Sequence, residues 1–149
     1  MVLKQNIASN KKAFFNYTIL EKIEAGLVLN GCEVKSLRRG DAALLDSFAK
    51  VVNNELFLFN TYIKPYEQGN RYNNSPTRDR KLLLHKNEIL KLIGKLEKKG
   101  LTLVPLRLYF NKNKVKVELG LGQAKKQFDK RRSIKEKDQK RQMDRASKF

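Results

Sequence analysis

The feature that most constrains this chain is a repeated pattern of two apolar runs joined by an asparagine-rich turn. In SFAKVVNNELFLFNTYI the runs flank Asn53–Asn54, and asparagine tolerates the positive φ of a tight hairpin turn. In LTLVPLRLYFNKNKVKVELGL the turn falls at residues 111–113. The arm that follows alternates strictly, with Val115, Val117 and Leu119 expected to face inward and charged residues between them to face outward. Both segments are therefore predicted to be β-hairpins.

Residue type and glycine spacing predict further elements. Residues 13–23 (AFFNYTILEKI) are rich in aromatic and β-branched side chains, which favours a strand. Residues 24–40 contain three glycines, and their spacing predicts a short helical turn stopped by Gly31 and then an extended piece. Pro105 has no amide hydrogen to donate, so the strand that contains it is expected to bulge there or to lie at a sheet edge.

One helix is expected at residues 86–99, where apolar and lysine side chains fall on opposite faces and Gly100 follows as the stop. The apolar face comprises Ile89, Leu90, Ile93 and Leu96, and the polar face Lys91, Lys95 and Lys98. Strands at short spacing, closed by hairpins and interrupted by one helix, predict a small antiparallel β-barrel. The expected fold class is therefore mainly β with helices (α+β).

The charge of the chain restricts its partner. Lys and Arg number 33 against 15 Asp and Glu, a formal net charge of +18 over 149 residues. Residues 123–149 contain eleven basic and four acidic residues, a net +7, so residues 1–122 keep the remaining +11. Like charges repel within a fold, and such an excess is typical of proteins with a polyanionic partner. Nucleic acid is the leading interpretation, and an anionic membrane surface is the main alternative.

We divide the chain into a body of residues 1–122 and a basic C-terminal tail of residues 123–149. The apolar residues of the tail form no sustained helical stripe, which disfavours a membrane-surface helix, but Glu136–Lys140 and Asp144–Lys148 have the i, i+4 spacing that supports a helix. A helix of this kind is marginal alone in water. We expect the tail to be disordered when free and helical once phosphates neutralise its cations. A charged end that only aids solubility is the alternative.

Cysteine usage and the lack of long apolar runs indicate the compartment. Cys32 is the only cysteine, which excludes an internal disulfide and a cysteine-based zinc site. The first residues lack the apolar run of a secretory signal, and 18 consecutive apolar residues occur nowhere. We therefore expect a soluble cytoplasmic protein.

The segment Lys64–Arg80 (KPYEQGNRYNNSPTRDR) is long for a loop within a compact domain, and such loops are usually functional or disordered. Its basic residues and tyrosines are Lys64, Arg71, Arg78, Arg80, Tyr66 and Tyr72. Cations pair with phosphates and tyrosine rings stack on unpaired bases, so RNA binding is one interpretation. A solvated loop whose tyrosines pack back on the barrel is the other.

Catalysis has little support in the residues. Glu33 and Lys35 form an acidic-x-Lys pair, which on a strand can hold a metal and orient water in some nucleases. That chemistry needs a further upstream carboxylate, usually Asp, and only Glu21 and Glu24 precede the pair. The alternatives are an exterior ion pair, or a Glu33 that accepts hydrogen bonds from bases. His85 has no cysteine or histidine partner, so we expect no metal site. Since no other pattern supports catalysis, we also expect no cofactor and no enzyme.

Five blocks of the sequence occur in the order and spacing of a known family. They are KKAFFNYTI, EAGLVLNGCEVKSLRRG, SPTRDRKLLLHKNEI, GLTLVPLRLYF and GLGQAKKQFDKRRSIKEKD. On these blocks the chain resembles the small protein B (SmpB) family, the bacterial SsrA-binding proteins that partner transfer-messenger RNA (tmRNA) in trans-translation. The resemblance implies an oligonucleotide-binding (OB)-like barrel with external helices, acting as a monomer away from membranes. A general RNA chaperone or ribosome-assembly protein on a similar barrel is the alternative.

The resemblance implies two partners. The body would bind the tRNA-like part of tmRNA, and the tail would occupy the decoding region and the empty mRNA channel of a stalled ribosome. The implied tmRNA-binding residues are Asn10, Lys11, Lys12, Glu33, Lys35, Arg38, Thr77, Arg78, Arg80 and Lys81. The implied ribosome-binding residues of the tail are Lys125, Lys126, Phe128, Asp129, Lys130, Arg131, Ile134, Lys135 and Glu136. Ser75 and Phe128 depart from the family pattern, which often has Asp and His there, and for Phe128 only stacking on a base is carried over.

Overall fold

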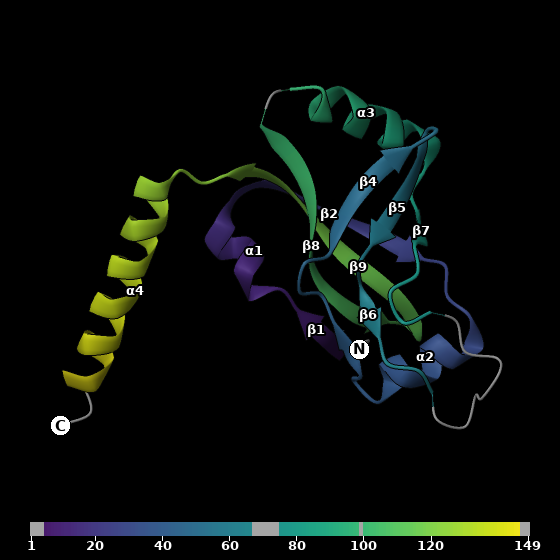
Figure 1. Cartoon of the computed structure of the whole chain (residues 1–149), viewed down its shortest axis with the longest axis horizontal. Helices are drawn as coiled ribbons and strands as arrows, with labels where there is room; N and C mark the ends of the chain where they lie inside the picture. The colour runs from purple at the N-terminus through teal and green to yellow at the C-terminus, as the bar shows by residue number, and fades with distance from the viewer. Residues whose placement is uncertain (1–4, 67–74, 99, 147–149) are drawn as a thin grey trace.

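The secondary structure is mainly β, with helices between and after the strands (Figure 1). The structure, a computed structural model, describes residues 5–66, 75–98 and 100–146, and for residues 127–129 and 146 it describes the backbone alone. The strands are β1 (Gln5–Ser9), β2 (Tyr17–Leu27), β3 (Ala42–Ala43), β4 (Phe48–Val52), β5 (Glu55–Phe59), β6 (Tyr62–Ile63), β7 (Arg80–Leu83), β8 (Leu101–Asn111) and β9 (Lys114–Ala124). The helices are α1 (Lys11–Asn16), α2 (Gly31–Arg38), α3 (Lys86–Leu96) and α4 (Gln127–Ala146).

The main sheet closes on itself. Its strands pair in the order β1–β8–β4–β5–β7–β2–β9, and β9 also pairs with β8, so all of these strands except β1 form a ring. Every pair is antiparallel. The predicted fold class, mainly β with helices, is therefore confirmed, and the strand pairing is that of a small closed barrel.

Both predicted hairpins are present. Asn53 and Asn54 join β4 to β5 with φ of 51° and 62°, and Lys112 and Asn113 join β8 to β9 with φ of 52° and 64°. The register of the β8–β9 pair shifts between Pro105 and Arg107, which confirms the predicted bulge. The inward and outward alternation predicted for the second arm is also confirmed, because the three aliphatic positions are buried and the three charged residues of the pattern are not.

The interior of the ring is filled by aliphatic side chains from the inward faces of the strands. Those exposed by no more than 1% include Leu56, Leu58, Leu103, Leu108, Val117 and Leu119. Truncating one buried leucine of this kind to alanine typically costs about 2–5 kcal/mol. This core fixes the strands of the ring, including β7. The strands in turn hold α2 and the two ends of the 64–80 segment in place.

The strand predicted from residue 13 begins instead as a helix. α1 runs to Asn16, and β2 then continues to Leu27, beyond the predicted end. Asn10 explains the helix, because its Oδ1 accepts a hydrogen bond from the Ala13 amide at 3.3 Å. Its Nδ2 donates to the Pro105 carbonyl at 2.9 Å, which ties the helix start to β8. This N-cap outweighs the strand preference of the aromatic residues that follow.

The order predicted around Gly31 is reversed in the structure. The residues before Gly31 belong to the end of β2 and a short connection, and Gly31 begins α2 rather than ending a helical turn. Asn30 is the N-cap, and Glu33 completes a capping box with it. Glu33 therefore lies in the first turn of a helix, and the prediction of an extended piece containing Glu33 and Lys35 is wrong.

The predicted helix at residues 86–99 is present but shorter and rotated. α3 ends at Leu96, Lys99 lies outside the described residues, and Gly100 has the left-handed φ of +87° that suits a stop. Leu92 is 3% exposed and faces the core, whereas Leu90 is 53% exposed. The assignment of Leu90 to the buried face is wrong, because α3 packs on the barrel through the neighbouring stripe.

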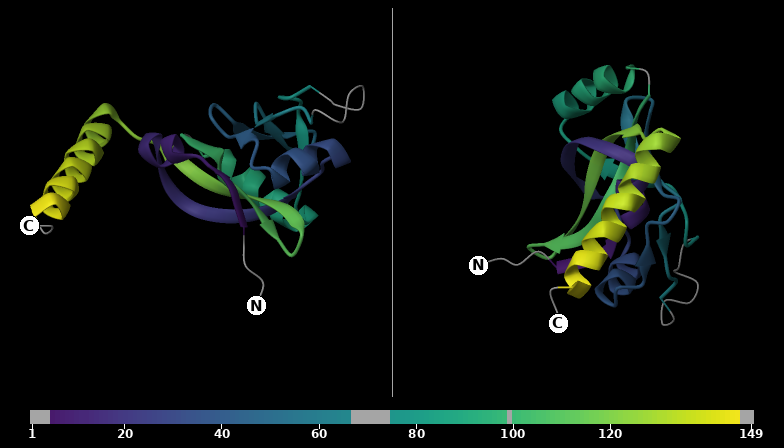
Figure 2. Two further views of the ribbon diagram at one scale, coloured as in Figure 1. Left: turned by 90° about the horizontal axis from the view of Figure 1, so that it is seen from below. Right: turned by 90° about the vertical axis from the view of Figure 1, so that its left-hand side faces the viewer.

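The C-terminal helix projects away from the barrel (Figures 1 and 2). β9 continues through Ala124, two residues beyond the expected end of the body, and α4 begins three residues later at Gln127. Within the described ranges, none of the helices combines the length and the apolar character that crossing a membrane requires.

Candidate nucleic-acid interface

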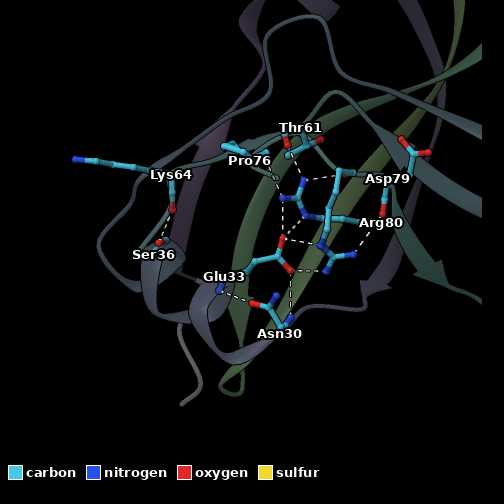
Figure 3. A network of polar contacts seen from close by, with 9 residues as sticks. Asn30, Glu33, Ser36, Thr61, Lys64, Pro76, Asp79 and Arg80 are labelled. Carbon is cyan, nitrogen blue, oxygen red and sulfur yellow. Dashed lines mark hydrogen bonds and ion pairs between the residues drawn. The ribbon is translucent and has the colours of Figure 1, made fainter. Parts of the chain in front are cut away.

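The interface is organised around the first turn of α2. The Glu33 amide donates to Asn30 Oδ1 at 2.9 Å, and the Asn30 amide donates to Glu33 Oε1 at 3.1 Å (Figure 3). These reciprocal bonds satisfy two amides that a helix start leaves without partners. They also fix the direction of the Glu33 carboxylate, which is 6% exposed.

Two arginines from the C-terminal end of the 64–80 segment contact this carboxylate. Arg78 approaches side-on, with Nε donating to Oε2 at 3.1 Å and Nη2 donating to Oε1. Arg80 donates from Nε to Oε2 at 2.7 Å. Paired arginine and carboxylate hydrogen bonds are geometrically specific as well as strong. We call Glu33, Arg78 and Arg80 the Glu33 cluster.

Arg80 is enclosed by protein. Its side chain is 0% exposed, and it donates to the carbonyls of Thr61 at 2.6 Å, Pro76 at 3.0 Å and Arg78 at 3.2 Å. Thr61 precedes the 64–80 segment, whereas Pro76 and Arg78 lie near its C-terminal end, so the guanidinium ties the chain before the segment to the end of the segment. In this conformation Arg80 has no open side toward an RNA, unlike the direct contact that the sequence predicted, because its donors are directed at Glu33 and backbone carbonyls.

The Glu33 cluster carries a net charge of +1, since two guanidinium groups share one carboxylate. Burial alone would raise the pKa of Glu33, but hydrogen bonds from Arg78, the Asn30 amide and Arg80 outweigh it and hold that pKa below its ordinary value. Burial lowers the pKa of Arg80, and Glu33 opposes that shift. Removing one partner from a buried ion pair leaves an uncompensated charge and typically costs about 3–5 kcal/mol.

This arrangement bears on the two functional interpretations of Glu33. Both carboxylate oxygens are engaged by guanidinium groups, so Arg78 and Arg80 occupy the positions that a divalent cation or base donors would need. Lys35 is exposed on another side of α2. The geometry therefore disfavours both the nuclease interpretation and a Glu33 that accepts hydrogen bonds from RNA.

The remaining predicted residues near α2 are mostly solvent-exposed. Lys35, Arg38, Thr77 and Lys81 are exposed, and 28% of the Arg78 side chain is exposed. Lys81 pairs with Glu55 at 3.3 Å across neighbouring strands, with both side chains about half exposed, and such a surface pair contributes little stability. The exposed Lys35, Arg38 and Lys81 therefore offer cations to a partner at little cost to the fold.

The predicted residues of α1 form a second group. Lys11 and Lys12 are exposed, whereas Asn10 uses its side chain for the N-cap and the bond to Pro105. Figures 1 and 2 show α1 and α2 on different sides of the barrel. The ten predicted tmRNA-binding residues thus fall into two separate groups rather than one patch.

Of the aromatic residues in the 64–80 segment, the structure places Tyr66 beside α2. The Lys35 Nζ lies 5.4 Å and the Arg39 guanidinium carbon 4.9 Å from the centre of its ring. Tyr72 and Arg71 lie outside the described residues. Tyr66 packs back on the protein, as one of the two interpretations of this loop expected, but it packs against cations.

In the tail, a two-residue joint connects β9 to α4. The Lys125 amide donates to the Asn16 carbonyl at the end of α1 at 2.9 Å. Its Nζ donates to Ser133 Oγ, two turns into α4, at 3.0 Å. Lys125 therefore anchors the joint on both sides, a role that the family motif did not predict for it.

The rest of the tail points its charges into solvent. Arg132 Nε donates to Glu136 Oε1 at 3.3 Å, so Glu136 pairs toward the N-terminus of α4 rather than with Lys140. Ile134 is 49% exposed. Lys130 is half-buried, and Lys126, Arg131, Lys135 and Glu136 are exposed. The side chains of Phe128 and Asp129 lie outside the described residues. Lys148 does too, so the predicted Asp144–Lys148 pair stays a prediction.

Several residues that build the interface were missed from the sequence. They support the cluster or its surroundings and comprise Asn30, Ser36, Arg39, Thr61 and Pro76. Lys64 was named for its charge, but here it contributes its backbone carbonyl. The Asn30-x-x-Glu33 spacing was a usable signal, because it matches a capping box. The backbone carbonyls that accept hydrogen bonds from Arg80 could not be predicted, because every residue type has one.

Comparison with known proteins finds a family that matches nearly the whole chain. The profile of the family described as "SmpB protein" matches residues 7–149. A protein named SsrA-binding protein from Carboxydothermus hydrogenoformans is 54% identical over 144 residues, which cover 97% of each chain. The SsrA-binding protein of Rickettsia bellii (strain OSU 85-389) is 57% identical over 146 residues, again 97% of each chain. That of Geobacter metallireducens is 58% identical over 140 residues, 94% of this chain and 92% of the relative.

A solved structure also matches this chain in three dimensions. It is described as "tmRNA-SmpB: a journey to the center of the bacterial ribosome", and it matches with a TM-score of 0.64 and 51% identity over 85% of each chain. The resemblance inferred from the five sequence blocks is thereby confirmed. This chain belongs to the SmpB family.

Proposed function

We propose that this chain is an RNA-binding adaptor of trans-translation, which binds the tRNA-like part of tmRNA and delivers it to stalled ribosomes. The observation that carries this proposal is the match to SsrA-binding proteins over nearly the whole chain. A protein of this kind supplies geometry and charge, and the ribosome performs the chemistry. It acts in the cytoplasm, where translation takes place, and it requires no cofactor.

The body is the part that holds tmRNA. Its exposed cations, Lys11 and Lys12 on α1 and Lys35 and Arg38 on α2, are available to phosphates. Arg78 joins them as the exposed member of the Glu33 cluster. We assign Asn10, Glu33 and Arg80 to positioning these groups rather than to RNA contact, because their polar atoms are engaged within the protein.

The tail is the part that reads the ribosome. A basic helix that extends from the body suits a channel walled by ribosomal-RNA phosphates, and intact mRNA would exclude it from that channel. Its few contacts with the body support a conformation that depends on the partner, disordered when free and helical on the ribosome. The tail residues named above would then contact ribosomal RNA in the decoding region.

Competition binding tests the proposal. A labelled tRNA-like fragment of tmRNA bound to the full chain is challenged with unlabelled fragment or with bulk tRNA. The fragment is expected to compete at a concentration at least tenfold lower than bulk tRNA. Equal competition would instead support a general RNA chaperone.

The enzymatic alternative has a separate test. Incubating the protein with Mg²⁺ and structured RNA is expected to leave the RNA intact. Cleavage that disappears in Glu33→Ala would revive the nuclease interpretation.

A further inference from the structure

Tyr66 and the two cations beside it have no assigned role. Lys35 and Arg39 stand one helical turn apart at the C-terminal end of α2, so both can reach the same ring. Their charged groups lie 5.4 Å and 4.9 Å from the centre of the Tyr66 ring, within the range of cation–π attraction. We call Lys35, Arg39 and Tyr66 the Tyr66 patch.

The backbone that carries Tyr66 is fixed to α2. Ser36 Oγ donates to the Lys64 carbonyl at 2.6 Å, and the Lys64 amide donates to the Asp41 carbonyl at 2.9 Å. Ser36 is 2% exposed, and Figure 3 shows its bond to Lys64 beside the Glu33 cluster. Tyr66 thus lies two residues after Lys64, whose backbone amide and carbonyl are both hydrogen-bonded. This limits the positions that the Tyr66 ring can occupy.

The cations of the patch are exposed and have no carboxylate partner within the described residues. Arg38, between them in sequence, turns instead toward Phe110, with 5.9 Å from its guanidinium carbon to the ring centre. The attraction of the Tyr66 ring holds two like charges near each other against their mutual repulsion. A bound phosphate would relieve that repulsion. Favourable interaction with the helix C-terminus explains the presence of cations there, but it does not require a fixed aromatic ring.

We propose that the Tyr66 patch is a phosphate-binding site for the RNA backbone, in which the ring pre-positions Lys35 and Arg39 for phosphate contact. Arg39 and Tyr66 thereby become binding residues of the body, in addition to those the family motif supplies. Pre-positioning helps because flexible side chains lose less freedom on binding when they are already held. The inference rests on the proposed function for the identity of the RNA.

The test measures the affinity of the full chain for the tRNA-like fragment of tmRNA at several salt concentrations. Arg39→Gln is expected to weaken binding several-fold and to reduce the slope of log K against log salt by about 0.7–0.9, the value for one lost phosphate contact. Tyr66→Leu is expected to weaken binding by about two- to fivefold with an unchanged slope, because the ring is lost but the charges remain. Tyr66→Phe keeps the ring and should bind as the wild type does.

Lys91→Gln is the matched control, since Lys91 is an exposed lysine on α3, which Figure 1 places at the opposite end of the barrel from α2. Circular dichroism melts verify that each variant is folded, and Arg39→Gln alone decides if Tyr66→Leu is not. A slope for Arg39→Gln equal to that of Lys91→Gln, or equal affinities for Tyr66→Leu and Tyr66→Phe, would overturn the inference. Failure of the adaptor proposal would look different, because the wild type itself would then bind bulk tRNA as tightly as the fragment.

Discussion

The Glu33 cluster and α4 use charge in opposite ways. In the cluster, two arginines converge on one carboxylate, and the hydrogen bonds of Arg80 end on protein atoms. In α4, the ion pair between Arg132 and Glu136 joins side chains that are 71% and 66% exposed. The cluster therefore stabilises the shape of the body, whereas the charges of α4 remain available to a partner.

This difference shows that a basic sequence does not assign its cations to one task. Arg78 and Arg80 stand two positions apart in the same segment, yet only Arg78 keeps an exposed side. Buried ion pairs are sensitive to the loss of one partner, and exposed pairs are nearly neutral to it. The two regions should consequently respond differently to the same kinds of substitution.

The largest expected effect comes from removing the tail. A chain that ends after Ala124 keeps β9 complete and should tag no stalled products above background in a reconstituted translation assay. Its free energy of unfolding and its affinity for the tRNA-like fragment should change by less than about 1 kcal/mol, because α4 packs little against the body. Normal tagging by the truncated chain would show that the tail has no part in the activity.

Glu33→Gln should have the next largest effect. It leaves two guanidinium groups without a counter-charge, and we expect the free energy of unfolding to fall by about 3–5 kcal/mol in urea denaturation. The matched control is Glu136→Gln in α4, for which we expect a change of less than about 1 kcal/mol. Similar losses for both variants would remove the distinction between the two regions.

Acid should weaken the body through Glu33. The folded protein holds the pKa of Glu33 below its ordinary value, so the unfolded chain binds a proton first as the pH falls. The stabilisation by Glu33 is therefore present above about pH 4.5 and is lost as the pH falls through the lower, folded pKa. The difference in unfolding free energy between wild type and Glu33→Gln should shrink over this range, and a constant difference would contradict the assignment.

Arg78→Gln should have the smallest effect of the series. It removes the exposed cation of the cluster but leaves Arg80 on Glu33, so we expect a loss of about 1–2 kcal/mol of stability. The slope of log K against log salt for the tRNA-like fragment should decrease by about 0.7–0.9. An unchanged slope would exclude Arg78 from the RNA interface, whatever its effect on folding.

The sequence predicted the elements whose pattern is local. Asn53–Asn54, the alternation after residue 113 and the bulge at Pro105 each follow from backbone or side-chain preferences within a few residues. The misassigned elements, α1 and α2, are short helices whose starts depend on Asn10 and Asn30. Each asparagine caps its helix by accepting one backbone amide hydrogen bond with its side chain, and a search for strand-forming residues overlooks such a bond.

The candidate site was predictable in part. Residue types and spacing named Glu33, Arg78 and Arg80 as important, but they did not indicate that the donors of Arg80 are directed at Glu33 and at backbone carbonyls. The position of Arg80 two residues before Leu82 was a signal, because side chains at i and i+2 of a strand lie on the same face, and here both are buried. The Tyr66 patch could not be predicted, since it depends on how α2 and the residues after β6 meet.

The joint at Lys125 gives α4 mechanical leverage. The helix has 20 residues and is therefore about 30 Å long. Since only a two-residue connection precedes it, a rotation of about 20° at its base would carry its far end through about 10 Å for a helix of that length. Small adjustments beside Asn16 are thus amplified into large changes of reach, so once the tail is helical on its partner, the tip of α4 can move far while the body stays bound to one RNA.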